Sequence, residues 1–236
     1  MIRLSARMEA VAALCEKGGC GADVGCDHAY VSIYLVQNGI FDKMLAMDLR
    51  KGPLSAAEEH IRDEGLTAKI ECRLSDGLCE LRAQEADSVI CAGMGGELMV
   101  RILSDGIEKI KAMKQLILQP QSEVAEVRRF LKRNSFKITQ QDMVFEDGKF
   151  YPMFRAVPGT EEDTGDDELY LEYGRQLLES AHPVLKKYLE TRIQSETSVR
   201  MQLKAAAEGG STKALARLEE KTAEIDKLNK ALSYYK

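Results

Sequence analysis

The stretch Asp23-Val24-Gly25-Cys26-Asp27-His28-Ala29-Tyr30 joins a short apolar strand to a helix through one glycine flanked by acidic residues. A glycine at such a turn lets the backbone approach a ligand closely, and the following helix presents its N-terminal amides. Loops that cradle phosphates usually carry several glycines and avoid acids, whereas here Asp27 and Ala29 follow the first glycine of a G-x-G-x-x-G pattern. The turn therefore favours a neutral or cationic nucleoside ligand, and S-adenosylmethionine is such a ligand.

Composition limits the classes of protein that fit this chain. Its 236 residues are 44% hydrophobic and 30% charged, which is enough for one sizeable core with a smaller appendage. No apolar run approaches the length of a membrane span, and the alternation of Arg3, Arg7 and Glu9 with apolar residues indicates an amphipathic helix instead of a signal peptide. The cysteines form no C-x-x-C pair, and no histidine lies at ligand spacing. We therefore expect a cytoplasmic protein with reduced thiols and no metal site.

The first 157 residues alternate short apolar runs with helical patterns, which predicts a parallel sheet covered by helices on both faces. Ser5 is placed to start the first helix, and Gly39 and Gly65 are placed to end later ones. Two extended runs, 137–145 and 149–157, flank the turn signal Asp147-Gly148. A parallel sheet finished by an antiparallel hairpin is expected of the Rossmann-like α/β fold of class I methyltransferases. The candidate parallel strands are 21–24, 44–47, 69–73, 86–92 and 115–118.

A second region follows the acidic stretch 161–168, which we interpret as a linker. Apolar residues recur at helical spacing over 178–206 and again over 215–232, and Gly209-Gly210-Ser211 separates the two stripes. Neither helix can bury its stripe alone, so we expect an antiparallel, coiled-coil-like hairpin, with Pro183 starting or kinking its first helix. The expected domains are a methyltransferase domain over 1–160 and a helical hairpin domain for tRNA binding over 161–236.

Short polar or glycine-rich segments follow four successive strands of the predicted sheet. Asp48 ends the second strand, where a carboxylate can accept hydrogen bonds from ribose hydroxyls, and Asp76 follows the third, where it can meet an adenine amino group. Taken alone, an acid at such a position is more often an ordinary turn or cap residue, and a methionine such as Met94 more often fills core. In an open sheet, however, ligands bind beyond the carboxyl ends of the strands, so all four segments should converge. The expected cofactor-binding residues are Asp23, Gly25, Cys26, Asp48, Asp76, Gly77, Ala92, Gly93 and Met94.

With these motifs the chain resembles the bacterial tRNA (adenine-N1)-methyltransferases that act on the adenosine at position 22. The resemblance spans essentially the whole chain, and its specific carriers are the stretch 23–30, Ala92-Gly93-Met94-Gly95-Gly96 and Leu116-Ile117-Leu118-Gln119-Pro120. The chain departs from the family pattern at Cys26, Ser32 and Gln121, where serine, proline and asparagine are usual. The resemblance implies S-adenosylmethionine as cofactor, tRNA as substrate, and a Rossmann-like domain followed by a coiled-coil-like one.

The chemistry of adenine N1 sets what the catalytic residues must do. N1 already has a lone pair, so catalysis is mostly positioning, and a carboxylate near the base can stabilise the positive charge that methylation creates. Asp27 is the candidate, with a helix N-cap as its alternative role. His28 can contact the methionine moiety or the base, or can act as a capping or packing group. Tyr30 can stack on a flipped base or pack against the sheet.

Basic residues on two segments can contact tRNA phosphates, although charge runs are often solvated helix faces. One is the helix near 124–134, and the other is the C-terminal region, where basic residues outnumber acidic ones from position 169 onward. The expected substrate-binding residues are Gly95, Gly96, Gln119, Pro120, Gln121, Arg128, Arg129, Lys132, Arg133, Lys186 and Lys187. We expect a monomer, with a dimerising coiled coil as the alternative. A methyltransferase for another RNA position or a small molecule, and a non-catalytic RNA-binding scaffold, remain alternative functions.

Overall fold

The computed structural model describes residues 2–161, 167–208 and 211–235. The chain divides into two compact units, Met1–Asp163 and Thr164–Lys236. Within the described ranges, no helix has both the length and the apolar character that a membrane span requires.

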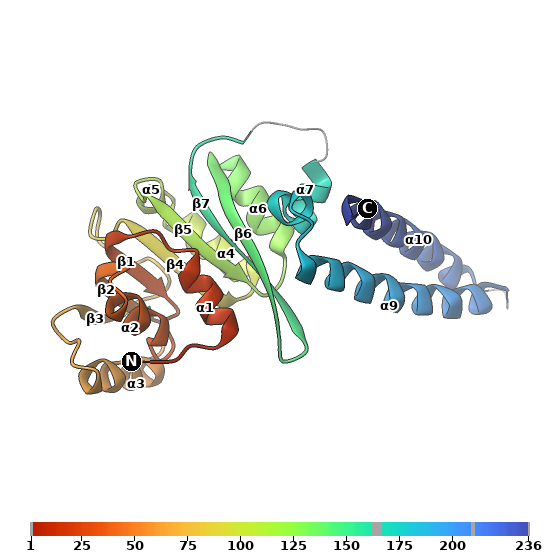
Figure 1. The fold of residues 1–236 in the computed structure, drawn as a ribbon. Coiled ribbons are helices and arrows are strands. Elements are labelled where there is room, and N and C mark those ends of the chain that lie inside the picture. The colour runs from red at the N-terminus through yellow and green to blue at the C-terminus, as the bar shows by residue number, and fades with distance from the viewer. Residues whose placement is uncertain (1, 162–166, 209–210, 236) are drawn as a thin grey trace. The chain divides into compact units, whose positions relative to one another are not determined.

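The first unit is built on a seven-stranded sheet (Figure 1). Five neighbouring strands are parallel, and the last two in the chain add an antiparallel hairpin at one edge. This arrangement confirms the predicted Rossmann-like α/β class. Across the sheet the strands follow in the order β3 (Ile70–Leu74), β2 (Phe41–Asp48), β1 (Gly18–Val24), β4 (Ser88–Met94), β5 (Gln115–Pro120), β7 (Lys149–Pro158) and β6 (Phe136–Glu146).

Helices cover both faces of this sheet and bury two separate hydrophobic clusters against it. Side chains alternate between the clusters along each strand: Val89 and Cys91 of β4 belong to one, and Ile90 between them belongs to the other. The central strands are therefore apolar on both faces, as a covered parallel sheet requires. One cluster takes α1 (Ala6–Ala13), α2 (Tyr30–Gln37) and α3 (Lys51–Asp63), and the other takes α4 (Gly96–Asp105), α5 (Ile107–Ile110) and α6 (Val124–Arg133).

Most local signals in the sequence have the expected structure. The Ser5 side chain accepts a hydrogen bond from the Met8 amide and caps α1. Asp147 and Gly148 both have positive φ, 49° and 76°, as the two central residues of a type I′ hairpin turn do. The alternative role of Asp27 as a helix cap is wrong, because α2 begins after Ala29, a left-handed residue that forms no side-chain cap.

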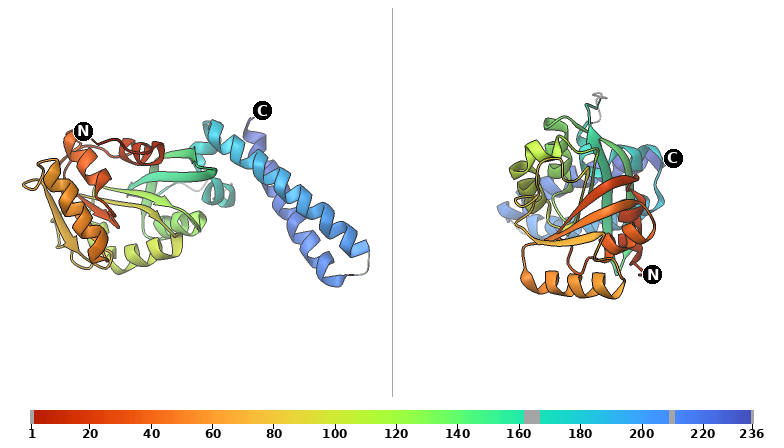
Figure 2. Two further views of the ribbon diagram at one scale, coloured as in Figure 1. Left: turned by 90° about the horizontal axis from the view of Figure 1, so that it is seen from below. Right: turned by 90° about the vertical axis from the view of Figure 1, so that its left-hand side faces the viewer.

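The second unit contains α7 (Asp167–Tyr173), α8 (Arg175–Glu179), α9 (Pro183–Glu208), α10 (Thr212–Leu232) and the 3₁₀ turn η1 (Ser233–Tyr235). The two long helices lie side by side as the predicted hairpin (Figure 2). Pro183 starts α9, which confirms one of the two roles expected for it, and Leu178 at the head of the apolar stripe belongs to the separate helix α8. Of the expected linker, 162–166 lies outside the described residues, and α7 begins at Asp167. The hairpin turn at 209–210 is also outside them.

A partly buried ion network around Glu196 links the two long helices. Glu196 of α9 is only 7% exposed, and its carboxylate pairs with Arg192 at 2.9 Å and with Lys221 of α10 at 2.8 Å. Glu224 of α10 pairs with the same two cations at 2.5 and 2.6 Å. Two acids and two bases therefore neutralise one another inside the hairpin.

Candidate active site

A cavity of about 540 Å³ opens at the carboxyl ends of β1 to β4, in the size range of small-ligand sites. The structure brings together in its lining all nine residues that the sequence suggested for cofactor binding, while their contact with a cofactor stays a prediction. Those nine are Asp23, Gly25, Cys26, Asp48, Asp76, Gly77, Ala92, Gly93 and Met94.

The glycine turn after β1 is tied to the neighbouring strand. The amides of Gly25 and Cys26 both donate to the carbonyl oxygen of Met47, at 2.8 and 3.0 Å. Gly25 has φ +75°, and a Cβ there would lie 3.2 Å from the Met94 methyl group, so the position suits glycine alone. Because these amides already have an acceptor, the turn is not a phosphate cradle.

Asp23, the last acid before this turn, is buried without a counter-ion. It is 4% exposed, and its carboxylate accepts a hydrogen bond from the Ser32 hydroxyl at 2.8 Å. The described residues provide no ion pair for it. Burial, reinforced by the nearby charge of Asp48, raises the pKa of Asp23 to about 6. A carboxylate in this position is stabilised by any cationic group that enters the cavity.

Asp48 at the end of β2 holds the two loops around it. One carboxylate oxygen accepts from the Arg50 amide at 2.8 Å, and the other accepts from the Asp27 amide at 3.3 Å. The Arg50 guanidinium lies 3.7 Å away but is largely exposed. Each oxygen retains acceptor capacity, so the carboxylate is oriented and still able to bind hydroxyl groups.

Asp76 follows β3 on a loop that carries the third part of the lining. Its carboxylate is exposed and lies 3.7 Å from the Arg101 guanidinium of α4. Gly77 beside it has φ +56°, and a Cβ there would lie 2.9 Å from the Ile102 side chain. The loop therefore packs closely against α4 and presents Asp76 at the rim of the cavity.

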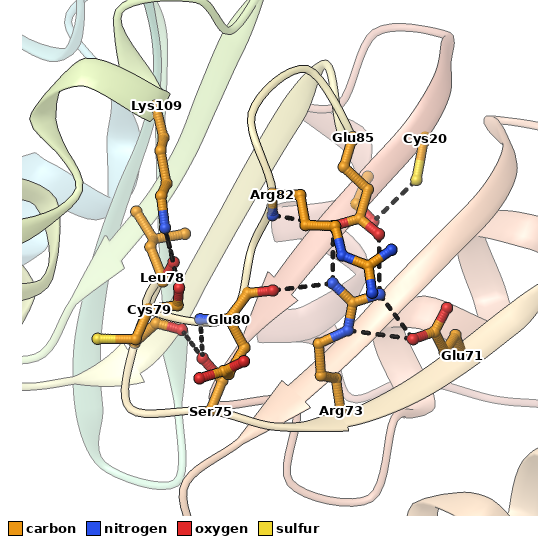
Figure 3. A network of polar contacts seen from close by, with 12 residues as sticks. Cys20, Glu71, Arg73, Ser75, Leu78, Cys79, Glu80, Arg82, Glu85 and Lys109 are labelled. Atoms are coloured by element: carbon orange, nitrogen blue, oxygen red, sulfur yellow. Dashed lines mark hydrogen bonds and ion pairs between the residues drawn. The ribbon is translucent and has the colours of Figure 1, made fainter.

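Two cations anchor this loop away from the cavity (Figure 3). Lys109 donates from its ammonium group to the carbonyl oxygens of Leu78 and Cys79, at 2.7 and 3.0 Å. Arg73 of β3 forms a bidentate pair with Glu85, at 2.7 and 2.8 Å, which holds the pKa of Glu85 at about 2. The Arg73–Glu85 pair joins the two ends of the segment 73–85, and Lys109 holds its middle, so Asp76 and Gly77 are fixed in position.

The fourth part of the lining is the segment Ala92 to Met94 at the end of β4, and the buried side chain of Gln119 holds it in place. The side-chain oxygen of Gln119 accepts from the Gly93 amide at 3.1 Å and from the Arg7 guanidinium at 2.9 Å. Arg7 lines the cavity and lies over the Tyr151 ring, 5.0 Å from its centroid. Sequence reasoning missed Arg7 as a site residue, because only the tertiary fold brings the first helix to the end of β5.

Of the remaining residues expected at the site, some line the cavity and others do not. Gln121 and Asp27 line the cavity, whereas His28, Tyr30, Gly95, Gly96, Gln119 and Pro120 do not. Gly96 is buried at the start of α4, where a Cβ would overlap the carbonyl oxygen of Ser122. Close packing therefore explains this glycine without a substrate.

The basic residues expected to contact RNA are also placed differently from one another. Arg128 is 3% exposed, donates to the Gln141 side chain, and lies over the Phe154 ring, so its role is internal. Arg129 pairs with Glu126 at 2.5 Å. Four others are exposed, namely Lys132 and Arg133 on α6 and Lys186 and Lys187 on α9.

Comparison with known proteins identifies the family. Residues 4–154 match the methyltransferase domain family. The tRNA (adenine(22)-N(1))-methyltransferase of Bacillus subtilis is 31% identical over 211 residues, which are 88% of each chain. The crystal structure of the B. subtilis tRNA methyltransferase TrmK has a TM-score of 0.86 at 28% identity and covers 98% of this chain and 100% of that one. M. capricolum TrmK in complex with S-adenosyl-homocysteine has a TM-score of 0.85 at 26% identity and 99% coverage of both chains. The chain therefore belongs to the tRNA (adenine(22)-N(1))-methyltransferase family.

Proposed function

We propose that this chain transfers the methyl group of S-adenosylmethionine to N1 of the adenosine at position 22 of tRNA. The observation that carries the proposal is the convergence of Asp23, Asp48 and Asp76, from three strand ends, in one cavity. The similarity to the B. subtilis enzyme extends over both units of the chain. All six cysteines are free thiols, which suits the reducing cytoplasm where we place the protein. That it acts as a monomer stays a prediction.

The cavity fits this cofactor in size and in charge. Buried Asp23 without a counter-ion suits the ammonium group, Asp48 suits the ribose hydroxyls, and exposed Asp76 suits the adenine amino group. S-adenosylmethionine supplies the electrophilic methyl group when it is bound. The amides of Gly25, Cys26 and Asp27 already have acceptors within the protein, so this turn disfavours the pyrophosphate of a dinucleotide.

The target adenine requires positioning and charge stabilisation from the chain. Its N1 lone pair is available at neutral pH, so no general base is needed. The Asp27 carboxylate is 64% exposed at the cavity, and its backbone is held by Asp48. It is the acid best placed to offset positive charge that develops on the base. Arg7 would oppose that charge, so we assign its guanidinium to a phosphate of the target nucleotide.

The reaction is tested by supplying tRNA and S-adenosylmethionine and identifying the methylated nucleoside by mass spectrometry. The proposal expects 1-methyladenosine, mapped to position 22. Methylation at another position, or only of a small molecule, would replace the proposed activity with the corresponding alternative. Absence of cofactor binding would favour a non-catalytic RNA-binding scaffold.

The role of Asp27 is tested by two substitutions. Asp27→Asn keeps the size but removes the charge, so single-turnover methylation should slow by about tenfold to a thousandfold while cofactor binding changes less. Asp27→Ala should behave similarly, because the side chain caps no helix. A wild-type rate for Asp27→Asn would remove this carboxylate from the reaction.

We further propose that the helical hairpin binds tRNA. Lys186 and Lys187 are exposed on α9, and sequence-independent phosphate contacts could orient a large RNA. A chain that ends at Asp163 should retain cofactor binding and lose tRNA affinity and methylation. Full methylation by a folded, truncated chain would exclude this role, and loss of a dimer with unchanged tRNA affinity would identify a dimerising coiled coil.

A further inference from the structure

Three rings gather beside the cavity without lining it. They belong to His28 in the loop before α2, to Tyr30 at the first position of α2, and to His60 of α3. The Tyr30 and His60 rings are stacked, with centroids 4.9 Å apart and planes 22° apart. The His28 ring lies 5.8 Å from Tyr30 and 5.6 Å from His60. Because Asp27 lines the cavity and its carboxylate lies 3.9 Å from Nε2 of His28, the cluster lies next to the cavity.

Polar contacts hold the cluster in place. Nδ1 of His60 lies 3.2 Å from the carbonyl oxygen of His28, and Nε2 lies 3.5 Å from the Tyr30 hydroxyl oxygen. His60 therefore connects α3 to the loop that follows the glycine turn. Rings fixed in this way lose little further conformational entropy when a flat ligand stacks on them.

Packing within the protein does not explain the cluster. Tyr30 is 43% exposed, and it belongs to neither hydrophobic cluster of the first unit. Tyr34, one turn further along α2, does pack against one of them. Tyr34 is thus partly buried against the core, whereas Tyr30 is exposed and contacts the two histidines.

We propose that His28, Tyr30 and His60 form a stacking platform for the nucleobase next to the target adenosine. The proposal rests on the proposed function, which supplies the RNA. An adenine that enters the cavity must leave its base stack, so the adjacent base loses a stacking partner. Exposed aromatic rings beside the cavity can replace that partner, and stacking on them tolerates any base.

Two substitutions of Tyr30 separate stacking from hydrogen bonding. Tyr30→Leu removes the ring and should weaken tRNA binding by about fivefold to a hundredfold, whereas Tyr30→Phe should stay close to wild type. His60→Ala should also weaken binding, and Glu59→Ala, an exposed neighbour on α3, is the matched control with no expected loss. The Kd for S-adenosylmethionine should be unchanged in all four variants, that is, in both Tyr30 variants, His60→Ala and Glu59→Ala. Equal tRNA affinity for Tyr30→Leu and wild type would overturn the platform.

A second comparison locates the base. We expect weaker binding to wild type for transfer RNAs that lack the base on the 5′ or the 3′ side of the target. For one of these two RNAs, the loss of binding free energy should not add to the loss caused by Tyr30→Leu, because both changes remove the same stacking contact. Fully additive losses on both sides would contradict the proposal. Because these are binding measurements, they remain decisive whichever nucleoside wild type methylates. Failure of the platform is thus distinguished from failure of the proposed reaction.

Discussion

The two units of the chain each bury an acidic side chain, and the surroundings of these two acids are opposite. Glu196 in the hairpin pairs with Arg192 and Lys221, whereas Asp23 in the sheet unit has one hydroxyl donor and, among the described residues, no cation. A buried acid with cationic partners belongs to the architecture of the protein. A buried acid without them reduces stability until a cationic ligand arrives. The contrast therefore separates a structural charge from a binding charge.

The largest expected effect is that of Asp23→Asn, which should act in opposite directions on binding and on stability. Loss of the charge should weaken S-adenosylmethionine binding by about 2 to 3 kcal/mol, as expected for a charged hydrogen bond. The free energy of unfolding of the ligand-free chain should rise by about 3 kcal/mol at pH 7.5, because a desolvated charge is removed. Calorimetric titration and urea unfolding measure the two effects. A variant that is less stable and binds normally would break the comparison.

The same substitution has a pH signature. Burial raises the pKa of Asp23 from 3.8 to about 6. Between these two pH values the native chain keeps a proton on Asp23, whereas the unfolded chain has released it. The stability contributed by this group is therefore present below about pH 4 and is lost as pH rises towards 6. The difference in unfolding free energy between Asp23→Asn and wild type should grow across this window. A difference that is independent of pH would show that Asp23 titrates normally.

Asp48→Ala should have the next largest effect, a loss of about 1 to 3 kcal/mol in cofactor binding, because ribose hydroxyls would lose their acceptor. The amides of Asp27 and Arg50 would lose theirs too, but both lie at the open cavity, where water can replace it. Calorimetric titration measures the affinity, and the melting temperature serves as the control for folding. Unchanged affinity would exclude Asp48 from the site.

Glu196→Gln tests the opposite side of the comparison. The variant should lower the free energy of unfolding by about 1 to 2 kcal/mol, less than for a fully buried pair, because Arg192 and Lys221 are partly exposed and can keep Glu224. Cofactor affinity should not change. If this substitution stabilised the chain, as Asp23→Asn is expected to do, the distinction between the two acids would fail.

The smallest expected effect is that of reversing charge at Lys186 and Lys187. The double substitution to Glu should weaken tRNA binding several-fold and reduce the dependence of log K on log salt by about one to two. Lys111→Glu is the control, because this exposed lysine precedes β5 and so lies at the amino ends of the parallel strands, away from the carboxyl ends that line the cavity. An equal loss of tRNA affinity in the hairpin variant and in Lys111→Glu would indicate a general effect of net charge.

Much of the sheet unit could be predicted because its signals are local. Alternating apolar runs gave the strands, and the rule that ligands bind at strand ends brought Asp48 and Asp76 to one cavity. Contacts between distant segments could not be predicted in this way. Arg7 reaches Gln119 only in the folded chain, and an alanine gives no local signal for the left-handed backbone at Ala29, which moves the helix start past Asp27.

The interior position of Arg128 could have been found. Val124 and Leu131 lie on the same face of α6 as Arg128, at spacings of four and three residues, and that face packs on the core. The sequence alone suggested a phosphate contact because it showed a basic run, whereas helical spacing indicates which of its members faces inward. Charge runs on amphipathic helices are better interpreted one face at a time.

The carbonyl oxygen of Met47, which accepts from both Gly25 and Cys26, has a consequence for selectivity among ligands that contain adenosine. ATP and NAD share the adenosine moiety with S-adenosylmethionine, and their phosphates need the free amides that a phosphate loop provides. Here those amides are occupied, and the charges beside them are carboxylates that repel anions. The turn thus discourages competition from adenine nucleotides without a separate gate, through two backbone hydrogen bonds between neighbouring strands.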